Sequence, residues 1–155
     1  MNSIVLVVDD SDLDRQMILT LLRARKPALD FVELCDGAAV LDYLKRCGRD
    51  ANPTTLPCLI LLDLHMPMAN GSDVLRVVKS DPTLRHIPVV IFSSSSREAD
   101  RNLCEQLGTD AYVIKSGNLH EFRTTVREIS DRWLETPPAS ASRTGAAPAK
   151  LASTV

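Results

Sequence analysis

The sequence predicts an α/β protein whose doubly wound parallel sheet carries helices on both faces. Short apolar runs recur along the chain without the polar alternation of a half-exposed strand, which indicates strands covered on both faces. The segments between these runs have apolar residues three or four positions apart, as amphipathic helices do. Because strands alternate with helices through short loops, we expect right-handed crossovers and a parallel sheet.

Five strands and five helices are predicted. In chain order, the apolar runs that predict the strands are Ile4–Val8, Phe31–Cys35, Leu59–Leu62, Val89–Phe92 and Ala111–Ile114. The apolar positions of the first four helices are Leu13, Met17 and Leu21, then Val40 and Leu44, then Val74 and Val78, and then Ala99, Leu103 and Leu107. Two helix starts have the spacing of a capping box, at Ser11 with Asp14 and at Ser95 with Glu98.

The last helix has the clearest period. Residues three and four positions apart share one face of a helix, so the apolar residues there form one stripe that we expect to face the core. The stripe consists of Leu119, Phe122, Val126, Ile129 and Trp133. The sequence contains no second set of such strands and helices, so we predict one domain over residues 1–135.

Composition excludes several classes of protein. The 155 residues carry a formal net charge of −2 without a basic cluster, which argues against nucleic-acid binding. No apolar stretch approaches the roughly 20 residues of a membrane helix and no basic leader opens the chain, so we expect a cytoplasmic protein with no membrane partner. Residues 136–155 are rich in Ala, Ser, Thr and Pro, and we expect a flexible tail.

Polar residues stand directly after four of the predicted strands. In an open parallel sheet, ligands bind beyond the carboxyl ends of the strands, which makes these residues the first functional candidates. They are Asp9, Asp10, Asp63, Ser93 and Lys115. Singly, each has a structural explanation, since an aspartate at a strand end often caps the next helix. Together, three like charges within a few ångströms need a cation or protons to relieve their repulsion, and an all-oxygen ligand set favours Mg²⁺.

This set of side chains favours phosphoryl transfer. A metal and Lys115 would neutralise phosphoryl oxygens while one carboxylate attacks phosphorus in line. Asp63 is the best nucleophile candidate because it stands alone after a wholly apolar strand, whereas the adjacent Asp9 and Asp10 are better placed to hold the metal. Ser93 would donate to a phosphoryl oxygen. The sequence contains no Gly-rich phosphate loop, which argues against a bound nucleotide.

Four ordered motifs resemble the receiver domain of two-component response regulators, a flavodoxin-like module that accepts phosphate from a histidine kinase. The motifs are Val7–Asp10, Leu61–Pro67 with Gly71, Ile87–Ser93 and Gly108–Lys115, and the resemblance spans about residues 4–134. It implies a five-stranded parallel sheet with the strand order 2-1-3-4-5.

The resemblance also implies a role for each candidate. Asp63 would be the phosphoacceptor and Lys115 would contact the phosphate. Mg²⁺ would be bound by Asp10, Asp63 and the backbone carbonyl of His65, with Asp9 assisting. The His65 side chain, two residues after Asp63, would influence the lifetime of the phosphate; a solvent-facing loop histidine is an equal alternative.

Ser93 and Tyr112 occupy the two switch positions of the family. Phosphorylation would draw Ser93 inward and let Tyr112 change rotamer; for Tyr112, a half-buried strand aromatic is the structural alternative. One departure from the family concerns Ser116, which stands where a cis proline usually follows the lysine. A cis bond before a residue other than proline costs about 2.5 to 4 kcal/mol, so this peptide is trans unless packing forces it, which leaves the direction of Lys115 open.

Within the family, the chain is most similar to the stand-alone regulators of phytochromes, the red-light sensor kinases. Three features carry this resemblance: the long connection Cys47–Pro57, the stretch Lys79–Pro88 and a last helix that bears Trp133. It implies a single-domain regulator whose only reactions are its own phosphorylation and dephosphorylation, and whose output is a protein partner. Stand-alone receivers often dimerise through the fourth helix, fifth strand and fifth helix, so the resemblance also implies a homodimer through these elements.

Two other functions fit parts of the sequence. An aspartate-nucleophile phosphohydrolase commonly carries a second aspartate two residues after the nucleophile, but His65 stands there and no cap domain is present. A degenerate receiver would bind partners without phosphate. The intact set of three aspartates, Ser93 and Lys115 argues against it, and Ser116 leaves it open.

Overall fold

The computed structural model describes residues 3–49 and 56–135 of the chain. The strands are β1 (Ile4–Val8), β2 (Asp30–Leu34), β3 (Leu59–Leu62), β4 (Val89–Ser93) and β5 (Ala111–Ile114). The helices are α1 (Asp12–Arg25), α2 (Gly37–Arg49), α3 (Gly71–Ser80), α4 (Glu98–Leu107) and α5 (Leu119–Trp133). All five predicted strands and all five predicted helices are therefore confirmed.

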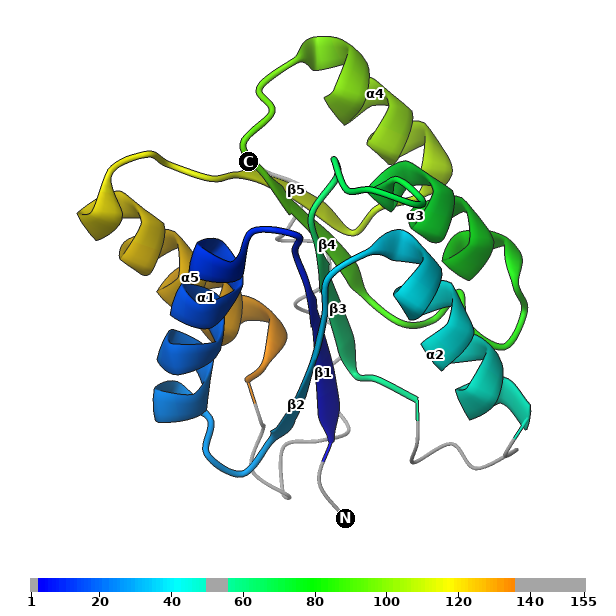
Figure 1. Cartoon of the computed structure of the whole chain (residues 1–155), viewed down its shortest axis with the longest axis horizontal. Helices are drawn as coiled ribbons and strands as arrows, with labels where there is room; N and C mark the ends of the chain where they lie inside the picture. Colours follow the sequence, from blue (N-terminus) through cyan, green and yellow to red (C-terminus); the bar gives the residue numbers. More distant parts are fainter. Residues whose placement is uncertain (1–2, 50–55, 136–155) are drawn as a thin grey trace.

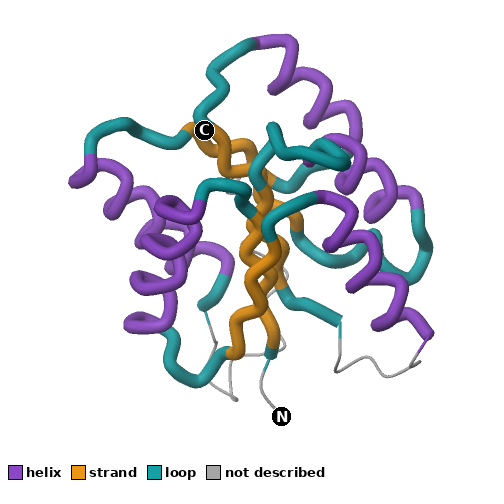
Figure 2. Tube along the Cα trace, in the orientation of Figure 1, coloured by secondary structure: helices purple, strands orange, loops and turns teal. Residues whose placement is uncertain are grey.

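The strands form one parallel sheet in the order β2-β1-β3-β4-β5. Helices α1 and α5 lie on one face of the sheet, and α2, α3 and α4 lie on the other (Figure 1). The sheet runs between these two helical layers (Figure 2). The predicted doubly wound, flavodoxin-like architecture and its strand order are confirmed.

Alternate strand residues supply two separate cores, which explains the unbroken apolar runs. Leu6 and Ile60 pack toward α2, α3 and α4, whereas Val5 and Leu61 pack toward α1 and α5. All four are 0 to 2% exposed. Each central strand is thus covered on both faces and needs apolar side chains at every position.

Local sequence predictions at the starts of α4 and α5 differ from the structure. Phe122, Val126 and Ile129 of the α5 stripe are buried as expected, but Leu119 is 58% exposed because it lies in the first turn, beyond the edge of the core. Helix α4 begins at Glu98 with Arg97 as its N-cap, so the predicted capping box at Ser95 is wrong.

No helix in the described part of the chain is long and apolar enough to cross a membrane. The core closes at its carboxyl end with Leu134, which is 4% exposed and packs beside α1 and α5 residues. The predicted tail, residues 136–155, lies outside the described residues.

Candidate functional site

The parallel sheet brings the predicted site residues to its carboxyl edge. The strand pairing continues one residue past the strands, since the Asp63 N–H donates to the Val8 carbonyl at 2.9 Å. In the same way, the Lys115 N–H donates to the Ser93 carbonyl at 2.7 Å. The backbone hydrogen bonds of the sheet therefore fix the backbone positions of Asp63 and Lys115, from which their side chains extend.

Three aspartates form an acidic cluster at this edge. Asp9, Asp10 and Asp63 can each present an oxygen atom within 4.8 Å of the others. Asp9 is 1% exposed and Asp63 is 8% exposed, whereas Asp10 is exposed to solvent. The cluster can bind a divalent metal ion, because carboxylate oxygens are the ligands that hard divalent cations prefer.

The surroundings of Asp63 oppose its negative charge. Burial raises the pKa of Asp63 from 3.8 to about 7, and the charges of Asp9 and Asp10 add to the increase. The Lys115 ammonium and the Leu64 N–H, which donates to Asp63 Oδ1 at 2.8 Å, act in the opposite direction. A cation bound here would add positive charge beside Asp63 and relieve the repulsion from Asp9 and Asp10 that Lys115 only partly offsets. The electrostatics of the cluster therefore fit a metal ion, as its geometry does.

Lys115 lies among carboxylates from three segments of the chain, the loops after β1 and β3 and the first turn of α1. Its Nζ is 2.6 Å from Asp9 Oδ2, 2.9 Å from Asp14 Oδ2 and 3.7 Å from Asp63 Oδ2. Burial disfavours the ammonium ion, but the hydrogen bond to Asp9 and the charges of Asp63 and Asp9 outweigh it and hold the pKa of Lys115 above its ordinary value. The sequence pattern does not place Asp14 in the site, because its spacing from Ser11 indicates a capping role.

The peptide between Lys115 and Ser116 is trans, since the described residues contain no cis peptide bond. The Ser116 hydroxyl donates to Glu121 Oε2 at 2.7 Å and accepts from the Asn118 N–H at 3.0 Å. Asn118 in turn caps α5 through the Glu121 N–H. Ser116 therefore ties the loop after Lys115 to the first turn of α5.

The His65 side chain points to α4. Its Nε2 lies 3.1 Å from Asp100 Oδ2, and the same oxygen accepts a 2.6 Å hydrogen bond from the Ser95 hydroxyl. The Ser95 hydrogen bond, with a smaller contribution from His65, holds the pKa of Asp100 below its ordinary value. His65 is 56% exposed but is not simply a solvent-facing loop histidine, because it connects the β3–α3 loop to α4.

Both predicted switch residues contact Ser95. The buried Ser93 hydroxyl accepts a hydrogen bond from the Ser95 N–H at 3.1 Å, and the Tyr112 hydroxyl donates to the Ser95 carbonyl at 2.8 Å. Tyr112 is partly buried, with the Arg101 guanidinium 5.4 Å from its ring centroid. Neither Ser95 nor Asp100 was predicted as part of the site, and their contacts depend on how α4 is placed.

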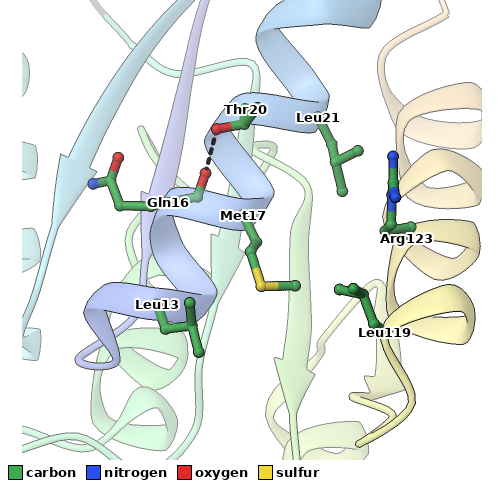
Figure 3. Close-up of a pocket in the computed structure, with 7 residues that line it drawn as sticks. All are labelled: Leu13, Gln16, Met17, Thr20, Leu21, Leu119 and Arg123. Atoms are coloured by element: carbon green, nitrogen blue, oxygen red, sulfur yellow. Dashed lines mark hydrogen bonds between the residues drawn. The ribbon is translucent and has the colours of Figure 1, made fainter.

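An apolar groove of about 320 Å³ lies between α1 and α5 (Figure 3). It is lined by Leu13, Gln16, Met17, Thr20, Leu21, Leu119 and Arg123. Leu13 is 70% exposed and Leu119 is 58% exposed, and both lie in the first turn of their helix. Because α1 and α5 each begin just after the carboxyl end of a strand, one end of the groove lies at the same end of the sheet as the acidic cluster.

This fold and this site together define a receiver domain, and comparison with known proteins agrees. The chain belongs to the response regulator receiver domain family, which matches residues 5–127.

Among individual proteins, the chain is similar to response regulator Rcp1 of Synechocystis sp., at 35% identity over 86% of this chain and 90% of Rcp1. Two solved structures are similar at 34% identity. The Mn²⁺-bound form of Rcp1 has a TM-score of 0.79 and covers 88% of this chain and 97% of that one. The phosphorylated cyanobacterial phytochrome response regulator RcpA has a TM-score of 0.80 and covers 89% of this chain and 98% of that one. The predicted resemblance to phytochrome regulators is confirmed.

Proposed function

We propose that the chain is a single-domain response regulator that accepts a phosphoryl group on Asp63 from a sensor histidine kinase and signals by phosphorylation-dependent protein interaction. The observation that carries the proposal is the placement of a buried carboxylate beside two further carboxylates and a buried ammonium ion. Apart from its own phosphorylation and dephosphorylation, the protein catalyses no reaction in this proposal. Its setting is the cytoplasm, without nucleic-acid or membrane partners.

Each site residue has a separate role in phosphoryl transfer. An Asp63 oxygen attacks phosphorus in line while the bond from phosphorus to the kinase histidine nitrogen breaks, and its electron pair stays on that nitrogen. Lys115 moves from its present carboxylate partners to a phosphoryl oxygen, and Ser93 donates to another. Mg²⁺, held by Asp10, Asp63 and the His65 carbonyl with Asp9 assisting, would supply positive charge against the phosphoryl oxygens.

The hydrogen bonds of Ser95 support a route for the signal. When the Ser93 hydroxyl turns to the phosphoryl group, it gives up the hydrogen bond that it now accepts from the Ser95 N–H. The Ser95 carbonyl holds the Tyr112 hydroxyl, so a shift of Ser95 frees Tyr112 to change rotamer. The β4–α4 loop thus transmits the modification to the surface of α4 and β5.

Two surfaces fit the two partners that this function needs. One end of the groove between α1 and α5 lies at the same end of the sheet as the acidic cluster, so a kinase that docks there brings its phosphohistidine toward Asp63. The similarity to RcpA, a phytochrome response regulator, favours a phytochrome as that kinase.

The face of α4, β5 and α5 fits a second copy of the chain. Arg101, Glu105, Glu128 and Arg132 surround its cavity, and Ile114 is 41% exposed. Charges of both signs around an apolar residue suit a two-fold interface, in which each residue meets the complementary residue of the other copy.

Intact-mass measurement after incubation with acetyl phosphate and Mg²⁺ tests the proposal. We expect one phosphate adduct that needs Mg²⁺, is removed by hydroxylamine as acyl phosphates are, and is absent from Asp63→Asn. Asp42→Asn is the matched control, because that carboxylate is 71% exposed on α2, and it should take up phosphate as the wild type does. An adduct that persists in Asp63→Asn would contradict the assignment. No adduct together with no Mg²⁺ binding would favour the degenerate receiver.

A further inference from the structure

We propose that Asp14 is a positioning residue that holds Lys115 for phosphoryl transfer. The inference rests on the proposed function of Asp63, and it adds a residue from α1 to the machinery of that site. Asp14 neither reacts nor binds the metal in this proposal. It acts through Lys115, which it keeps within ion-pair distance of Asp63 but beyond a hydrogen bond to that carboxylate.

The contacts of the Lys115 ammonium are uneven. Asp9 and Asp14 accept hydrogen bonds from Nζ at 2.6 and 2.9 Å, whereas Asp63 Oδ2 is 3.7 Å away, beyond an ordinary hydrogen bond. The Lys115 side chain is 7% exposed and that of Asp14 is 28% exposed. An ion pair that is shielded from water in this way is stronger than an exposed one. The attraction of Asp14 is therefore strong enough to affect where the Lys115 ammonium ion lies.

The Asp14 carboxylate is not engaged in capping α1. The Ser11 hydroxyl accepts from the Asp14 N–H at 3.3 Å, which is the first half of a capping box. The second half is missing, because the Ser11 N–H donates to Asp9 Oδ1 at 2.9 Å instead of to Asp14. With that donor taken by Asp9, the Asp14 carboxylate is directed to Lys115 across 101 residues of sequence.

This arrangement meets two opposed requirements of the site. Asp63 must stay free to attack phosphorus and to contact a metal, yet Lys115 must be near enough to meet the incoming phosphoryl oxygens. Without the charge of Asp14, the ammonium would shift to the remaining carboxylates, Asp9 and Asp63. It would then neutralise the nucleophile and compete for the oxygen that phosphorus needs. Asp14, which lies on α1, opposes the attraction of the ammonium ion to Asp63.

A double-mutant cycle of Asp14→Asn and Lys115→Met tests the proposal. Phosphorylation of the full chain by acetyl phosphate with Mg²⁺ is followed by intact mass over a range of donor concentrations. We expect Asp14→Asn to lower the rate at saturating donor at least fivefold and to leave the half-saturating donor concentration unchanged. In the Lys115→Met background, itself slow, Asp14→Asn should have no further effect.

The charge-matched control is Glu98→Gln. Glu98 is an exposed carboxylate in the first turn of α4, at the same edge of the sheet, and its removal should leave the rate within twofold of wild type. An equal loss in Glu98→Gln, or an Asp14→Asn effect that persists without Lys115, would show a general effect of charge and overturn the proposal. An unchanged or faster rate in Asp14→Asn would overturn it as well.

Urea unfolding without Mg²⁺ gives a readout that does not depend on phosphorylation. It is measured on the wild type, Asp14→Asn, Lys115→Met and the double variant. We expect the two substitutions to be coupled by at least fivefold in the unfolding equilibrium constant, because each removes the partner of the other. Additive effects would overturn the pairing and with it the proposal. If the wild type takes up no phosphate, the proposed function fails, and this cycle still decides whether Asp14 holds Lys115.

Discussion

At the scale of single residues, Asp63 is the group whose charge the fold opposes most directly. The same burial that shields the nucleophile from water also raises its pKa to about 7. An unfolded chain exposes this carboxyl to water, where its pKa is about 3.8. Between these two values the folded protein retains a proton that the unfolded chain has lost, so folding stability is linked to pH.

We expect the metal-free protein to lose stability as the pH rises from about 4 to 7. In this range the native state binds more protons than the unfolded state, and each unit of pKa difference is worth about 1.4 kcal/mol, so the loss reaches at most about 4 kcal/mol. Urea unfolding with EDTA at several pH values measures it. Asp63→Asn should remove most of the slope, and a slope unaffected by that substitution would place the titrating group elsewhere.

At the scale of elements, the junction of β3, its loop and α3 holds the Asp63 backbone in place. Gly71, the first residue of α3, donates its N–H to the Leu64 carbonyl at 2.7 Å. A Cβ atom at Gly71 would lie 2.3 Å from the Asp63 carbonyl oxygen, far inside van der Waals contact. Only glycine allows α3 to begin this close to the acidic cluster.

Gly71→Ala should therefore displace the Asp63 backbone. We expect a loss of about 1 to 3 kcal/mol in the free energy of unfolding, as overpacking typically causes, together with weaker Mg²⁺ binding by calorimetry. Gly48→Ala is the control, since its Cβ would meet no atom within 4 Å in helix α2. That variant should be as stable as wild type or gain up to about 1 kcal/mol from helix propensity. Equal stability of the two variants would contradict the close approach at Gly71.

At the scale of the whole molecule, two different surfaces are left for partners. The α1 and α5 layer presents the groove with Leu119, and β5, at one edge of the sheet, presents Ile114. The two side chains are similar in size and exposure, at 58% and 41%. They offer a matched pair with which to separate kinase docking from self-association.

We expect Ile114→Glu to weaken dimerisation of the phosphorylated chain at least tenfold. The substitution replaces the apolar residue of each copy with a charged one, which a two-fold interface would bury twice. Analytical ultracentrifugation over a range of concentrations measures the dissociation constant. Leu119→Glu should leave that constant unchanged and slow phosphotransfer from the kinase instead. If both substitutions affect dimerisation equally, the assignment of the α4, β5 and α5 face is wrong.

Much of this fold follows from local patterns in the sequence. Runs such as Leu59–Leu62 predict buried strands because a strand covered on both faces needs an apolar residue at every position. The period of Phe122, Val126 and Ile129 predicts the buried face of α5 in the same way. Asp63 and Lys115 could be found because parallel strands present their carboxyl ends at one edge, whatever the loops do. The strand order itself came from the resemblance to receiver domains.

Only the tertiary structure decided which carboxylates hold Lys115, which helix meets His65 and which apolar residues remain exposed. The sequence pattern predicts that Asp14 is half of a capping box. No local pattern shows that Asp9, and not Asp14, accepts the hydrogen bond of the Ser11 N–H. The pairing of Asp14 with Lys115 joins residues 101 positions apart and requires α1 and β5 to be placed by two separate crossovers. The physical reason is range: periodicity and burial are set by neighbours along the chain, whereas an ion pair depends on where distant segments come to lie.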